Sequence, residues 1–81
     1  MKTNITIYNS KKNIIIVNDV IINPQKMITF QTNIIKFNNN TYQLLPIHNK
    51  GHIYVTIDDI INSPKTIEID DRTIYYFICL N

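Results

Sequence analysis

The stretch KKNIIIVNDVIIN, residues 11–23, decides the fold class. Asn18 and Asp19 divide its apolar run into two halves. Both residue types tolerate the positive φ angles that tight primed turns require, and the β-branched side chains on either side disfavour a helix. The stretch therefore predicts a β-hairpin with a two-residue loop, in which Ile16 faces Ile21.

The composition extends this prediction to the whole chain. Its 81 residues include 19 isoleucines, one glycine and no alanine, and Ile, Val and Thr together fill 30 positions. A branched Cβ favours the pleated strand over the helix. We therefore expect residues 1–81 to form a single small all-β domain, built mainly from antiparallel hairpins.

Three further hairpins are predicted from turn residues that lie between apolar stretches. Each proposed register places apolar side chains together, as cross-strand packing requires. The expected pairs are Phe37 with Tyr42 and Ile35 with Leu44 around Asn39-Asn40, Leu45 and Ile47 beside Val55 and Ile53 around Asn49–Gly51, and Ile69 with Ile74 and Ile67 with Tyr76 around Asp71-Arg72.

One segment, TIDDIINSP at residues 56–64, breaks the strand pattern. Thr56 and Asp59 have the spacing of a capping box, three isoleucines follow helical periodicity, and Pro64 ends the segment. We expect one short helix around residues 57–62. The order from residue 26 is then three strands, the helix and two strands, which is compatible with a small barrel, a half-open barrel or a sandwich.

The charged residues are distributed unevenly along the chain. Residues 1–57 carry six lysines against one acid, and residues 58–81 carry five acids against one lysine and one arginine. The net charge of +2 is too small to indicate a polyanionic partner. Such an asymmetry orients a partner or a second copy, or it reflects two ordinary solvated surfaces.

The sequence shows no pattern typical of catalysis or of cofactor binding. A single glycine, Gly51, excludes a glycine-rich phosphate loop. His48 and His52 flank the predicted turn at Gly51, but Zn²⁺ requires three or four ligands and no further histidine is present. We expect no catalytic residue, no metal and no cofactor. The lone cysteine, Cys79, lies in an apolar stretch and is expected to be buried.

Aromatic and basic residues on an exposed sheet face form the candidate interaction surface. Tyrosines can stack on nucleobases while neighbouring lysines contact phosphate. A single arginine argues against nucleic-acid recognition, since arginine supplies the bidentate contacts to bases and phosphates. The candidate residues are Tyr42, Tyr54, Lys36, Lys50, His48, His52 and Tyr75.

The most informative feature is the failure of apolar and polar residues to alternate. The stretches NIIIV, VII and YYFICL are apolar on both faces, whereas a half-exposed antiparallel strand alternates. A chain this short cannot cover both faces of several strands by itself. We expect a second copy, in a dimer or higher homo-oligomer, or a different protein to cover them.

These observations favour a non-catalytic binding protein. The abundance of Asn, Ile, Lys and Tyr fits an A/T-rich genome, so we expect a small viral or mobile-element effector that inhibits a host protein by direct contact. The alternatives are a single-stranded nucleic-acid or nucleotide binder built as a small β-barrel, and a structural subunit or accessory domain.

No stretch resembles a signal peptide or membrane span, so we expect a cytoplasmic protein, in the host cytoplasm if it is viral, with no membrane contact.

Overall fold

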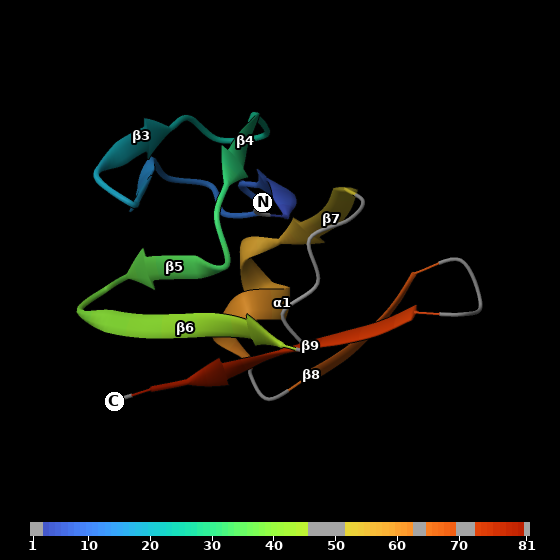
Figure 1. The fold of residues 1–81 in the computed structure, drawn as a ribbon. Coiled ribbons are helices and arrows are strands. Elements are labelled where there is room, and N and C mark those ends of the chain that lie inside the picture. The colour runs from blue at the N-terminus through green and yellow to red at the C-terminus, as the bar shows by residue number, and fades with distance from the viewer. Residues whose placement is uncertain (1–2, 46–51, 63–64, 70–72, 81) are drawn as a thin grey trace.

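The computed structural model describes residues 3–45, 52–62, 65–69 and 73–80. It consists of three small sheets and one short helix (Figure 1). The predicted all-β class with one short helix is confirmed. The elements are β1 (Asn4–Tyr8), β2 (Ile15–Val17), β3 (Val20–Ile22), β4 (Met27–Gln31), β5 (Ile34–Phe37), β6 (Asn40–Leu45), β7 (His52–Thr56), α1 (Ile57–Ile61), β8 (Lys65–Ile69) and β9 (Thr73–Cys79).

The hairpin predicted from residues 11–23 is confirmed in its register and in its loop. Ile16 lies directly opposite Ile21. Asn18 and Asp19 form the turn with φ angles of 49° and 64°, the left-handed values that a primed two-residue loop needs. The inward side chains of the hairpin, Ile15, Val17 and Ile22, are buried.

The N-terminal strand β1 lies in the middle of a three-stranded sheet with the order β4-β1-β7. It pairs antiparallel with β4 and parallel with β7. Ile5 and Ile7 of β1 are fully buried, and their partners in β7 are Ile53 and Val55. This parallel pair contributes four aliphatic side chains to the core.

The hairpin predicted between β6 and β7 is wrong. Leu45 of β6 lies opposite Tyr76 of β9, and Val55 of β7 lies opposite Ile7 of β1. The two strands therefore belong to different sheets. Strand alternation defines which face of a strand is buried but not which strand it pairs with. The proposed turn, 49–51, and Ile47 lie outside the described residues.

The second predicted hairpin, β5–β6, is present with a different loop. Asn38 and Asn39 form the turn, with φ angles of 50° and 64°, so Ile35 faces Tyr42 and not Leu44. Moving the loop by one residue changes each partner by two positions. The same side chains consequently share a face in both registers.

The last predicted hairpin, β8–β9, is also present with a corrected register. Ile69 lies opposite Thr73, where Ile74 was expected, and Ile67 lies opposite Tyr75. Three residues separate the strands, where two were expected, and these residues, 70–72, lie outside the described ranges. Together β5, β6, β9 and β8 form a four-stranded antiparallel sheet in that order.

Four strands, rather than the three expected, lie between residue 26 and the helix. The chain leaves the first sheet after β4 and enters the four-stranded sheet at β5. Thr32 and Asn33 make this change of sheet: the Thr32 amide donates to the carbonyl of Thr3, and the Thr32 hydroxyl accepts from the amide of Ile34. The described strands are thus distributed over three sheets.

The predicted helix and its capping box are confirmed. The Thr56 hydroxyl accepts from the Asp59 amide at 3.2 Å, and the Asp59 carboxylate accepts from the Thr56 amide at 3.0 Å. Ile57 and Ile60 are fully buried. Within the described ranges, no helix is both long and apolar enough to cross a bilayer.

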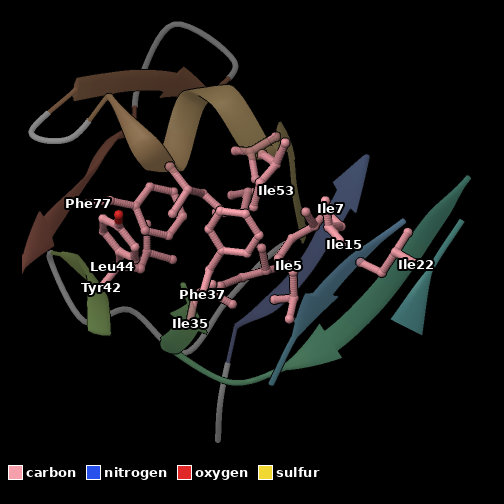
Figure 2. Packing of buried hydrophobic residues seen from close by; sticks show 14 residues of the cluster. Ile5, Ile7, Ile15, Ile22, Ile35, Phe37, Tyr42, Leu44, Ile53 and Phe77 are labelled. Atoms are coloured by element: carbon pink, nitrogen blue, oxygen red, sulfur yellow. The ribbon is translucent and has the colours of Figure 1, made fainter. Parts of the chain in front are cut away.

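One continuous core joins the two larger sheets, the hairpin and the helix. Figure 2 shows Phe77 and Leu44 on one side, Ile5 and Ile53 on the other, and Phe37 between them, all beneath α1. Since every sheet contributes to one cluster, the three sheets form a single folded unit.

Candidate functional site

The outer face of the β2–β3 hairpin is apolar and exposed. Ile14, Ile16 and Ile21 lie on it, opposite the buried face, and they are 58, 57 and 61% exposed. Ile16 and Ile21 are direct cross-strand partners. We refer to these three residues as the hairpin face. Single exposed aliphatic residues are common on protein surfaces, but a contiguous apolar patch marks an interaction site.

A groove of about 830 Å³ runs between β2 and the turn that joins β5 to β6. Ile15 and Phe37 line it and are almost completely buried, so we describe them as its floor. Ile14 and Ile16 of the hairpin face line one side. The remaining lining residues are polar: Lys11, Asn13, Asp19, Lys36, Asn38, Asn39, Asn40 and Thr41. The groove therefore combines an apolar floor with a polar rim.

Asn18 holds the hairpin against β5 and so shapes the groove. Its side-chain oxygen accepts from the Lys36 amide at 2.7 Å, and its side-chain NH₂ donates to the Ile34 carbonyl at 3.2 Å. Its own amide donates to the Lys36 carbonyl at 3.1 Å. The residue that forms the turn thus also closes the exposed edge of β5.

Asn9, which is completely buried, holds the segment before β2 in place. Its side-chain NH₂ donates to the carbonyls of Asn13 and Ile22, and its side-chain oxygen accepts from the Lys11 amide, each at 2.9 Å. This role of Asn9 could not be predicted from the sequence, because an asparagine after a short strand is typical of an exposed turn. Asn9 and Asn18 together fix the geometry of the groove.

Lys11, at one end of the groove, also contacts the helix. Its ammonium lies 2.8 Å from the carboxylate of Asp58, and the hydroxyl of Ser10 donates to the same carboxylate at 2.8 Å. The hydrogen bond from Lys11, followed by that from Ser10, lowers the pKa of Asp58 below its usual value. Because both partners are about half exposed, the pair contributes little to stability.

The structure brings together two of the predicted surface residues, Tyr54 and His52. They lie on the outer face of β7, where Tyr54 is 69% exposed. Their rings stack with centroids 4.5 Å apart. The Nε2 atom of His52 forms a 2.5 Å hydrogen bond with the hydroxyl of Thr6, which in turn bonds the hydroxyl of Thr29. These contacts hold the imidazole in position.

The other predicted surface residues are not part of this arrangement. Tyr42 is 4% exposed and belongs to the core, so its predicted place on an exposed face beside Lys36 is wrong. It shares the inward face with Ile35, whereas Lys36 is exposed in the groove. The positions of Lys50 and His48 and the side chain of Tyr75 lie outside the described residues.

The structure also bears on the candidate metal pair and on the cysteine. The partner of His52 in the sheet is Asn4, and Leu45 and Val55, which the predicted hairpin paired, belong to different sheets. In the described part of the chain, no group of three His, Cys, Asp or Glu side chains could hold a metal ion. Cys79 is exposed, contrary to prediction, since it ends β9 beyond the buried part of that strand.

Comparisons of the chain with protein-family models, with curated proteins and with solved structures find no match. The features of the described residues that bear on function are the hairpin face, the groove and the stacked pair of Tyr54 and His52.

Proposed function

We propose that this chain is a non-catalytic binding protein that contacts another protein through the hairpin face. The observation that carries the proposal is the exposure of Ile14, Ile16 and Ile21 on one side of a hairpin whose other side already fills the core. Each isoleucine that a partner covers contributes on the order of 1–2 kcal/mol, since about 60% of its surface is still exposed. A partner surface that covers all three gains enough apolar burial to anchor a complex.

The proposal includes a biological role, inhibition of a host protein by a small viral or mobile-element effector. The A/T-rich coding bias of the composition supports this source. A short chain that binds by an exposed apolar face can block a site on its partner without chemistry of its own. A second copy of the chain is the other occupant that the hairpin face would suit.

The test replaces Ile16 and Ile21 by aspartate together and compares capture of proteins from a host lysate. The native chain is expected to retain one protein in a stoichiometric amount, and the double variant at least tenfold less. Two aspartates opposite each other repel and favour a strand less than two isoleucines do, so circular dichroism must show that the variant is folded. If it is not, Ile16→Thr with Ile21→Thr, which keeps the branched Cβ, replaces it in the same test.

Tyr54→Ala is the matched control, since this side chain is more exposed but lies on another sheet. Equal capture by the native chain and the double aspartate variant would refute the proposal. Sedimentation at high micromolar concentration separates the two occupants, because self-association doubles the mass in the absence of any lysate protein.

The stacked pair of Tyr54 and His52 favours a second candidate function, the binding of single-stranded nucleic acid or nucleotides. An exposed aromatic ring on a sheet face offers a stacking platform for a base. This function predicts that a fluorescent oligothymidine binds at low salt, more weakly as salt is added, and at least tenfold more weakly to Tyr54→Ala. Absence of binding at low salt would exclude it, whereas the Ile16 and Ile21 variant should bind as the native chain does.

A further inference from the structure

The backbone of β5 shows how an exposed strand edge is closed in this protein. In an antiparallel pair, opposite residues alternate between those that exchange backbone hydrogen bonds and those whose backbone groups point away from the partner strand. Phe37 and Asn40 flank the turn, so the next residue, Lys36, presents its amide and carbonyl outward. Asn18 accepts from that amide and donates to that carbonyl.

The same alternation leaves an open edge on β2. Val17 and Val20 flank the turn of the first hairpin, so the next pair, Ile16 and Ile21, has outward-pointing backbone groups. The amide and carbonyl of Ile16 therefore point away from β3. Neither has a hydrogen-bond partner among residues 3–45 or the other described ranges. Such unpaired groups are a template for a further strand.

This open edge borders the groove, because Ile16 is one of the residues that line it. The buried floor offers apolar contact to side chains on one face of an added strand. Lys36 is exposed on the rim and forms no ion pair within the described residues. Lys11 is paired with Asp58, and Asp19 lies on the rim as well. The groove thus suits a mainly apolar segment with a single acidic residue, rather than a polyanion.

We propose that the groove binds an extended segment of a partner protein, which adds a strand to β2. The segment pairs its backbone with the amide and carbonyl of Ile16, directs alternate apolar side chains toward Ile15 and Phe37, and places an acidic side chain beside Lys36. Main-chain pairing of this kind gives affinity, and the pockets for alternate side chains give selectivity. The inference deepens the proposed function and rests on it for the nature of the partner.

The open edge of β2 is short, which limits the affinity that the segment alone can provide. β2 has three residues, and at about 3.3 Å for each residue this is about 10 Å of strand. A segment of this length binds weakly alone, and its attachment to a partner that also covers the hairpin face raises the effective affinity.

The experiment selects binders from a phage library of random heptapeptides on the immobilised full chain, with several copies of the peptide on each phage so that weak binding is retained. A synthetic copy of an enriched peptide is then titrated into the ¹⁵N-labelled protein, and amide hydrogen exchange is followed. We expect apolar residues at alternate positions with one acid, exchange at the Ile16 amide slowed at least tenfold, and an unchanged rate at the Ile21 amide. Ile21 is the internal control, since its outward groups lie on the opposite edge of the same hairpin.

Two variants test the side-chain contacts. Lys36→Glu should weaken the peptide at least tenfold, and Lys26→Glu should leave its affinity unchanged, because Lys26 is also exposed but does not line the groove. A peptide that is N-methylated at alternate amides should not bind. The inference is overturned if no peptide is enriched, if the enriched peptides leave the Ile16 amide unprotected, or if Lys36→Glu binds them equally well.

The outcomes also separate this inference from the proposed function. If the double aspartate variant loses the lysate protein while no peptide protects Ile16, the hairpin face binds a partner and the strand addition is wrong. If peptides protect Ile16 while capture of the lysate protein is unchanged in that variant, the groove binds a segment and the proposed role of the hairpin face is wrong.

Discussion

Replacing Phe77 by alanine is expected to lower the free energy of unfolding by about 3–5 kcal/mol, the usual cost of removing a large buried aromatic side chain. Phe77 is completely buried, lies opposite Leu44 in the sheet and packs beneath α1 (Figure 2). A chain of this length has a total stability of about 4–12 kcal/mol. The expected loss is therefore a large fraction of the total free energy of unfolding.

Urea denaturation followed by circular dichroism measures this effect. With a slope of about 1–3 kcal/mol per molar urea, the midpoint should fall by at least about 1 M, and the variant could be partly unfolded in buffer. Tyr76→Ala is the matched control, since the neighbouring side chain is 38% exposed and its loss should cost about 1 kcal/mol. Equal midpoints for the two variants would contradict the placement of Phe77 in the core.

Replacing Asn18 by glycine is expected to lower the free energy of unfolding by about 1–3 kcal/mol, since two side-chain hydrogen bonds of about 0.5–1.5 kcal/mol each are lost. Glycine keeps the positive φ of the turn without strain, so the loss reports the bonds to Lys36 and Ile34 and not the turn itself. The amide and carbonyl that they satisfied become unpaired at the edge of β5.

Asn38→Gly is the control for this measurement. Asn38 occupies the same position in the other two-residue turn, with a φ of 50° against 49° for Asn18, and its side chain forms no hydrogen bond within the described residues. Its replacement should leave the stability unchanged or raise it slightly. If the two glycine variants have the same midpoint in urea, Asn18 does not join the hairpin to β5.

Turn chemistry explains which strand registers could be predicted. Asn18 and Asp19 are flanked directly by valines, so only one loop position keeps the apolar residues paired. The second hairpin has three consecutive asparagines, Asn38, Asn39 and Asn40, and two loop positions bury the same side chains. Alternation could therefore identify the inward residues but not the loop.

The pairing of β1 with β7 could not be read from the sequence for a different reason. Parallel partners are far apart in the chain and share no turn, so no local signal joins residues 4–8 to residues 52–56. The turn residues at 49–51 consequently led to the prediction that β7 pairs with β6, the strand before it. This error also placed His48 opposite His52, a juxtaposition for which the sheet gives no support.

The candidate site was predicted in part. The apolar residues on both sides of the stretch at 11–23 indicated an uncovered surface, and Ile14, Ile16 and Ile21 form it. The groove could not be foreseen, because it depends on the β5–β6 turn lying beside β2. Tyr42 was misplaced on the exposed face, although the predicted register already paired it with the inward Phe37, whereas Tyr54 was correctly expected on an exposed face.

The central place of β1 has a consequence for the order in which the chain can fold during its synthesis. Strand β1 is synthesised well before β7, so both of its edges can be covered only after residues 52–56 have been made (Figure 1). The β2–β3 and β5–β6 hairpins can form as soon as they leave the ribosome. Strand β1, which carries Ile5 and Ile7, keeps one edge unpaired until β7 is available. Completion of the β4-β1-β7 sheet therefore follows the formation of both hairpins and joins two segments that are far apart in the chain.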